Sequence, residues 1–76
     1  LMYATGQGGL TKDAAKAVDF FRKAALQGNA DAQNNLGAMY HLGEGIKKDN
    51  TKAREWYKKS AAQGNADAQA NLKTLE

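Results

Sequence analysis

Several features that often stabilise small proteins are missing from this sequence. It contains no cysteine and no proline, and it has a single histidine. Without cysteine there can be no disulfide and no thiolate metal site, and one histidine alone cannot hold a metal ion. No run of about 18 apolar residues is present, so no membrane span is expected. We therefore predict no metal and no cofactor.

The size and the charge of the chain narrow its class further. Its 76 residues suffice for one domain at most, and a chain this short buries only about 60% of its unfolded surface. The formal net charge of +3 is mild, and it falls short of an evident nucleic-acid-binding domain. The chain begins with Leu1 and shows no signal-peptide pattern. We expect a piece of a longer protein, whose targeting signal lies outside it.

What the sequence does contain is an internal repeat. The heptapeptide QGNADAQ occurs at residues 27–33 and again, letter for letter, at 63–69. The same offset of 36 residues aligns Lys16-Ala17 with Lys52-Ala53 and Phe20-Phe21 with Trp56-Tyr57. A fixed period of this length indicates stacked copies of one supersecondary unit.

Within each unit the apolar residues recur with a helical period. One stripe in each unit follows the i, i+3, i+4, i+7, i+8 pattern of an amphipathic helix. These stripes comprise Ala17, Phe20, Phe21, Ala24 and Ala25, and then Ala53, Trp56, Tyr57, Ser60 and Ala61. A second helix carries Ala32, Gln33, Leu36, Met39 and Tyr40 on one face. We expect all four aromatic residues of the stripes in the core, and no strand.

The repeated heptapeptide predicts a helix stop, a tight turn and a helix start. Gly28 and Gly64 can adopt the left-handed conformation that ends a helix. Asn29 and Asn65 can cap the helix that follows. The block is therefore interpreted as a structural corner rather than as a binding motif.

The other connection is longer and also contains two glycines. Gly43 and Gly45 allow unusual backbone turns, and Asp49 is expected to cap the next helix, as Asp13 is in the first unit. A GxG pair beside a helix start can indicate phosphate binding. Here no strand precedes the pair, no third glycine follows it, and the Asp cap occupies the amides that a phosphate would need.

The pattern L-G-x-x-Y-x-x-G-x-G followed by D-x-x-K-A-x-x-W-Y and Q-G-x-A-x-A-Q runs through residues 36–69. It resembles the Sel-one-like repeat, a relative of the tetratricopeptide repeat. The plain tetratricopeptide unit has a shorter period and a proline, and neither feature is present here. The resemblance implies an all-α fold, a right-handed superhelix (solenoid) of antiparallel helix pairs.

The expected elements follow from the periodicity and the resemblance together. A stub at 1–5 ends one helix and is followed by a helix at 13–27. The central repeat, 30–63, contains helices at 30–42 and 49–63, and residues 66–76 start the next repeat. Because each unit buries its apolar face only against its neighbours, we expect further repeats in the complete protein or end-to-end self-association.

The resemblance also implies that the first helix of each pair lines a concave surface. The exposed residues expected there are polar, small and mostly uncharged, and they suit hydrogen bonds to a protein or peptide partner. The main candidates are Asp31, Asn34, Asn35, Ala38, His41, Asp67 and Asn71. Ala70 and Thr74, and Ala4 and Thr5 in the stub, extend this surface. A merely solvated face is the alternative reading of these residues.

Catalysis and nucleic-acid binding are not expected. His41 lacks a neighbouring nucleophile, because Ser60 belongs to the packing stripe of another helix. A basic cluster contains Lys47, Lys48, Lys52, Lys58 and Lys59. We expect ion pairs of Lys59 with Glu55 and of Lys23 with Asp19. Such pairs are typical of a helix surface that faces solvent. No aromatic residues interleave with the cluster as a platform for bases, although an anionic partner stays an alternative.

The sequence therefore predicts a non-enzymatic interaction module, a segment of a scaffold or adaptor. The resemblance further implies a bacterial source, with an exported or periplasmic location compatible with the composition. Two other roles stay open: a structural spacer beside a functional domain elsewhere in the protein, and an immunity protein against a bacterial toxin.

Overall fold

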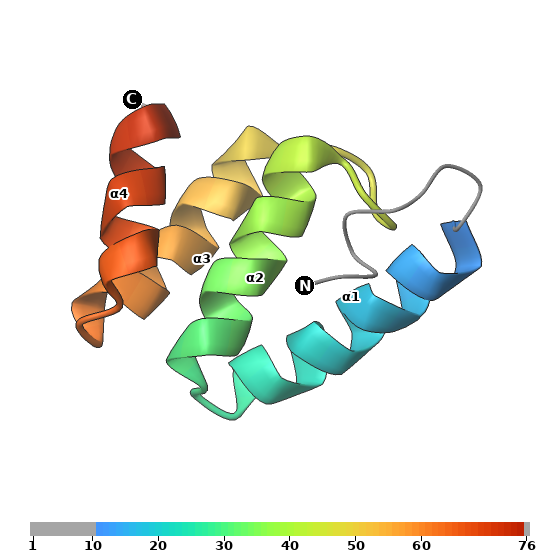
Figure 1. Ribbon diagram of the computed structural model, residues 1–76, viewed down its shortest axis with the longest axis horizontal. Coiled ribbons are helices and arrows are strands. Elements are labelled where there is room, and N and C mark those ends of the chain that lie inside the picture. The colour runs from blue at the N-terminus through green and yellow to red at the C-terminus, as the bar shows by residue number, and fades with distance from the viewer. Residues whose placement is uncertain (1–10, 76) are drawn as a thin grey trace.

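The computed structural model describes residues 11–75, and these form four helices. They are α1 (Thr11–Leu26), α2 (Ala30–Leu42), α3 (Asn50–Ala62) and α4 (Ala66–Leu75), as Figure 1 shows. No strand occurs in this part of the chain. Each helix packs against the next one along the chain, and the all-α fold expected from the sequence is confirmed. The expected stub at 1–5 lies outside the described residues.

The repeated heptapeptide forms the same corner twice. Gly28 and Gly64 take φ values of 93° and 91°, in the left-handed region that favours glycine. Asn29 Oδ1 accepts a hydrogen bond from the N–H of Ala32 at 2.8 Å, and Asn65 Oδ1 accepts one from Ala68 at 2.8 Å. The predicted stop, turn and cap are therefore present in both units.

The longer connection between α2 and α3 is held at both of its ends. The N–H of Gly43, which has a φ of 72°, donates to the carbonyl of Met39 at 2.8 Å. Asp49 caps α3 by accepting a hydrogen bond from the N–H of Lys52 at 3.1 Å, and its own N–H donates to the Tyr40 carbonyl at 3.0 Å. These bonds keep the residues before Asp49 out of the helix.

The matching cap expected at Asp13 is wrong. The first helix begins at Thr11, so Asp13 lies two residues inside α1. In the second unit the bond from Asp49 to Tyr40 delays the start of the helix. In the first unit Thr11 and Lys12 are helical, which both residue types tolerate at low cost.

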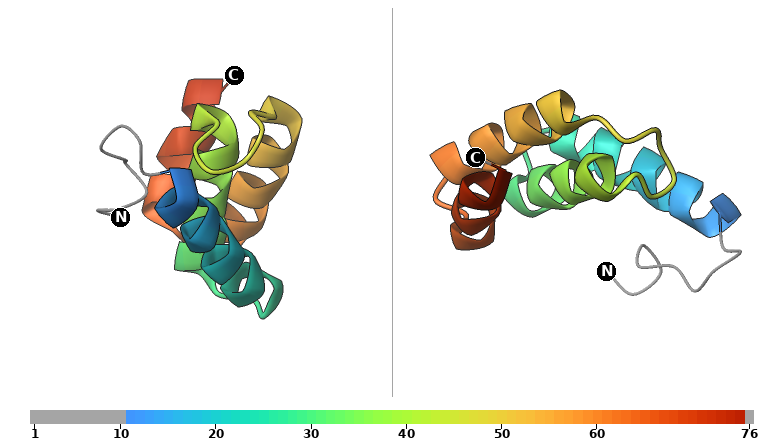
Figure 2. Two further views of the ribbon diagram at one scale, coloured as in Figure 1. Left: turned by 90° about the vertical axis from the view of Figure 1, so that its right-hand side faces the viewer. Right: turned by 90° about the horizontal axis from the view of Figure 1, so that it is seen from above.

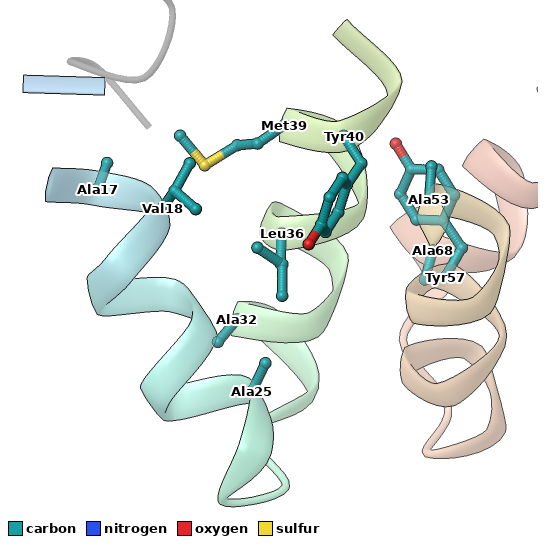
Figure 3. Packing of buried hydrophobic residues seen from close by; sticks show 10 residues of the cluster. All are labelled: Ala17, Val18, Ala25, Ala32, Leu36, Met39, Tyr40, Ala53, Tyr57 and Ala68. Carbon is teal, nitrogen blue, oxygen red and sulfur yellow. The ribbon is translucent and has the colours of Figure 1, made fainter. Parts of the chain in front are cut away.

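The core lies on both sides of α2. Leu36 is fully buried and Met39 is 2% exposed. Figure 3 shows Met39 pointing toward Val18 of α1, while Ala53 and Tyr57 of α3 lie on the other side of α2. The predicted buried face of α2, which also includes Ala32 and Gln33, is confirmed. One helix thus supplies the apolar surface that two neighbours share.

The expected burial of all four aromatic residues is wrong for one of them. Tyr57 is buried, Phe21 and Trp56 are half-buried, and Phe20 is 65% exposed, touching the ring of Phe21 edge-on. The buried face of α1 is centred on Ala17, Val18 and Ala25. Ala17 and Ala25 belong to the predicted stripe, but Val18 is buried in place of Phe20, so the buried face is turned by part of the roughly 100° that separates neighbouring residues.

The two corners are also joined by polar groups inside the stack. Ser60 is fully buried, and its Oγ donates to the carbonyl of Ala30 at 2.6 Å. Gln63 Nε2 donates to Gln33 Oε1 at 2.9 Å, and Gln33 in turn donates to the carbonyl of Ala25 at 3.1 Å. The second corner therefore rests on the first through specific hydrogen bonds. Figure 2 shows the resulting order, with α2 and α4 on one side and α3 on the other.

Candidate functional site

The candidate partner-binding residues lie on α2 and α4, the first helices of two successive repeats. We use the name polar face for Asp31, Asn34, Asn35, Ala38, His41, Asp67 and Asn71. Asp31 and Asp67 are exposed, and the other five are half-buried. Figure 1 shows α2 and α4 running in the same direction. The structure brings Asn34 of α2 beside Asn71 of α4, 37 positions away in the sequence.

Two hydrogen bonds between side chains connect the two sides of the polar face. Asn71 Nδ2 donates to Asn34 Oδ1 at 3.0 Å, and Asn65 Nδ2 donates to Asp31 Oδ1 at 3.0 Å. Asn34 is one of the residues that the sequence analysis predicts for partner binding. Its bond to Asn71 gives it a structural role as well, since it ties one repeat to the next.

No pattern in the sequence indicates this pair. Asn71 is the repeat counterpart of Asn35, whereas the counterpart of Asn34 is Ala70. The bond therefore joins non-equivalent positions of two units, and an alignment of the repeats alone does not reveal it. It depends on the angle and the displacement between α2 and α4.

His41 lies at the opposite end of α2 from Asp31. Its Nδ1 is 3.3 Å from Asn50 Oδ1 at the start of α3. In the tautomer that carries its proton on Nδ1, the ring donates to Asn50, and Nε2 is then an acceptor. Within residues 14–75 no cluster of three or more His, Asp or Glu side chains could hold a metal ion. The site offers hydrogen-bond donors and acceptors rather than a catalytic constellation.

The charge on the polar face is confined to one end. Asp31 and Asp67 both lie in the first turn of their helices, where the N-terminal end of the helix dipole favours a carboxylate. Toward the other end, Thr74 Oγ1 donates to the carbonyl of Ala70 in its own helix at 3.2 Å. The expected contribution of Ala4 and Thr5 lies outside the described residues.

The predicted basic cluster is divided between two regions. Lys47, Lys48 and Lys52 line a hollow of about 390 Å³ with Arg22, Tyr40, Ile46 and Asp49. Lys59 lies apart, with its Nζ 5.2 Å from the centre of the Trp56 ring. The predicted ion pairs are wrong in the described part of the chain: Asp19 pairs with Arg22 at 3.5 Å rather than with Lys23, and Lys59 is over Trp56 rather than beside Glu55. The hollow itself was not foreseen, because α1 supplies its arginine.

The helix pairs and the way in which they stack define the structural class of the chain. Helix pairs of constant period, stacked on their neighbours and joined by repeated corners, make the chain a segment of an α-helical solenoid. The family model described as Sel1 repeat matches residues 1–29 and 30–65. The chain belongs to the Sel1 repeat family, as the resemblance in its sequence indicated.

A solved structure supports the same assignment. The crystal structure of a Sel1 repeat protein from Oxalobacter formigenes is 44% identical to this chain and superposes with a TM-score of 0.79. The match covers 82% of this chain and 26% of that chain, so the sequence spans a minor part of the length of its relative. A comparison with curated proteins found no match. This neighbour agrees with the expected bacterial source.

The family sets the general character of the site. Sel1 repeats are generally protein-interaction modules, and they are typically not enzymes. Between Thr11 and Leu75, no helix is long and apolar enough to cross a membrane.

Proposed function

We propose that this chain is a segment of a scaffold or adaptor, and that the polar face on α2 and α4 binds a protein or peptide partner. The observation that carries the proposal is the bond between Asn34 and Asn71, which holds two successive first helices in one fixed, partly open surface. A surface with a preset geometry orders fewer groups on binding and therefore binds more tightly. No reaction is assigned to the chain.

The chemistry of the polar face suits the backbone of an extended peptide. Asn34 uses its oxygen toward Asn71 and keeps its amide N–H groups as donors, and Asn71 keeps its oxygen as an acceptor. Asn35 offers both kinds of group. Peptide N–H and C=O groups alternate along a strand and need partners of both kinds. The small side chain of Ala38 leaves room for the main chain of the peptide to approach closely.

The proposal is tested with a peptide library displayed on phage and selected against the 76-residue chain. We expect enriched peptides whose affinity, measured by calorimetry, falls about tenfold or more in the double variant Asn35→Ala/His41→Ala. This corresponds to the loss of two hydrogen bonds at about 0.5–1.5 kcal/mol each. Asn34 is left intact in this variant so that the bond to Asn71 persists.

The matched control removes two exposed polar side chains of α3, in the variant Thr51→Ala/Lys58→Ala. We expect it to bind the selected peptides as the unmodified chain does. Selection without enrichment, or equal affinity of all three proteins, would contradict the proposal and favour a structural spacer.

A further inference from the structure

The basic hollow lies on a part of the molecule that the proposed function does not use. It is bounded by α1, by the end of α2, by the connection at 43–49 and by the first turn of α3. The polar face lies instead on α2 and α4. In Figure 1 the connection is the loop that leaves the upper end of α2, on the side toward α1.

The charge that lines the hollow is strongly unbalanced. Four cations, Arg22, Lys47, Lys48 and Lys52, face one acid, Asp49. Asp49 already accepts a hydrogen bond from the first turn of α3, so its carboxylate is partly engaged in capping that helix. In residues 14–75 the one ion pair is that of Arg22 with Asp19, and it is exposed. The three lysines therefore present their charges to whatever enters the hollow.

The hollow also has an apolar floor. Tyr40 is 8% exposed, and Ile46 is half-buried against the core. The ammonium of Lys52 lies 5.8 Å from the centre of the Tyr40 ring, which holds this cation over the floor. An occupant that fits this lining carries several negative charges around an apolar group.

The connection that supplies two of the lysines has a fixed path. Gly45, with a φ of 74°, lies against the backbone of Ala14 in α1, where any Cβ would overlap the Ala14 carbonyl group. The other end of the connection is held by the bond from Asp49 to Tyr40. Lys47 and Lys48 are therefore carried by a segment that is packed on α1 and tied to α2, rather than by a free loop.

From this combination we infer that the hollow binds an acidic peptide segment of a partner protein, with carboxylates toward the four cations and one apolar side chain on Ile46. The charge imbalance and the apolar floor together favour this partner over nucleic acid. Bases need exposed aromatic rings for stacking, whereas Tyr40 is only 8% exposed and the ammonium of Lys52 lies over its ring.

The test uses fluorescence anisotropy with a fluorescein-labelled peptide of glutamates and aspartates around one central leucine. A second peptide, with glutamine and asparagine in place of every acid, reports binding that does not depend on charge. We expect the acidic peptide to bind the 76-residue chain, the neutral peptide not to bind, and added salt to weaken the complex.

Three variants locate the site. Lys47→Gln/Lys48→Gln removes two cations of the hollow, and both side chains are exposed, so the fold is unaffected. We expect about tenfold weaker binding of the acidic peptide, and a smaller loss for Arg22→Gln from α1. The control Lys58→Gln/Lys73→Gln removes the same charge from exposed positions of α3 and α4 and should bind unchanged.

Each other result overturns the inference. Equal losses in the hollow variant and in the charge-matched control would mean that only net charge matters. Equal binding of a peptide in which glycine replaces the central leucine would show that the apolar floor takes no part in binding. Tighter binding of a labelled single-stranded RNA of similar length, with the same sensitivity to Lys47 and Lys48, would assign the hollow to nucleic acid. The Asn35→Ala/His41→Ala variant should bind the acidic peptide normally, so this outcome is independent of the polar face.

Discussion

Gly37 lies where α2 packs closely against α3. A Cβ at this position would lie 2.8 Å from Cδ1 of Tyr57 and 3.2 Å from the carbonyl oxygen of Ala53. Its φ is ordinary for a helix, so the requirement for glycine comes from the space and not from the backbone conformation. This contact fixes how near the two central helices can approach.

We expect Gly37→Ala to destabilise the fold by about 1–3 kcal/mol, because the added methyl group forces α3 away from α2. The free energy of unfolding is measured by urea denaturation followed by circular dichroism. In a Tyr57→Leu background the same change should cost clearly less, since most of the overlap is with the ring. Equal costs in both backgrounds would contradict this reading of the contact.

Tyr57 also gives the stability a dependence on high pH. Burial of its ring raises the pKa of the hydroxyl above the ordinary value of 10.0, because the charged form loses hydration. The folded state then holds the proton more tightly than the unfolded state. The contribution to stability is complete below pH 10 and is lost as the pH rises through the folded pKa.

Replacement of Tyr57 by Phe should therefore flatten the loss of stability above pH 10. Unfolding midpoints in urea, measured for both proteins between neutral pH and pH 11, provide the comparison. Parallel curves for the two proteins would show that other groups, such as the lysines, account for the whole decline.

The structural roles of single residues differ in how well they can be predicted from the sequence alone. The caps at Asn29, Asn65 and Asp49 were predictable because they depend on local chemistry within one turn. The exposure of Phe20 was not, since the buried face of α1 is turned toward Val18, on the side away from Phe20. The bond of Asn34 to Asn71 was also not predictable, because it depends on how two helices are placed in space.

At the scale of elements, the two corners act as a connector between repeats. Ser60 of α3 donates to the Ala30 carbonyl at the start of α2, and Gln63 donates to Gln33. Both bonds join the end of the central repeat to its own beginning, and they hold the second corner against the first. The repeated heptapeptide therefore serves the stacking of units in addition to ending and starting helices.

Ser60→Ala is expected to lower the free energy of unfolding by about 1–2 kcal/mol, since the Ala30 carbonyl then lacks its buried donor. Thermal unfolding followed by circular dichroism measures the change. Thr74→Ala, which removes a hydroxyl bonded only within an exposed turn of α4, is the matched control and should change stability little. If Ser60→Ala leaves the free energy of unfolding unchanged, water replaces the hydroxyl without cost.

The elements themselves were largely predictable. Helical periodicity and glycine corners give the number and approximate extent of the helices, because both signals are local. The start of α1 was misplaced by two residues, since the bond that delays α3 joins Asp49 to another helix. The hollow beside the connection was missed for a related reason: Arg22, Tyr40 and Lys52 come from three helices whose packing the pattern does not specify.

At the scale of the whole molecule, the stack offers two surfaces of different chemistry. The polar face on α2 and α4 presents amides and two carboxylates, and the basic hollow presents four cations around an apolar floor. On the two proposals made above, the chain would hold two partners at one time, because the two surfaces are built from different parts of the helix pairs.

The central claim is that the polar face is the surface to which a partner binds. The most direct measurement is a titration of the ¹⁵N-labelled chain with a library-selected peptide, with amide chemical shifts recorded by NMR. We predict shift changes concentrated on α2 and α4, including Asn34, Asn35 and His41, that vanish in the Asn35→Ala/His41→Ala variant. Changes confined to α1 and α3, with α2 and α4 unaffected at saturation, would contradict the account.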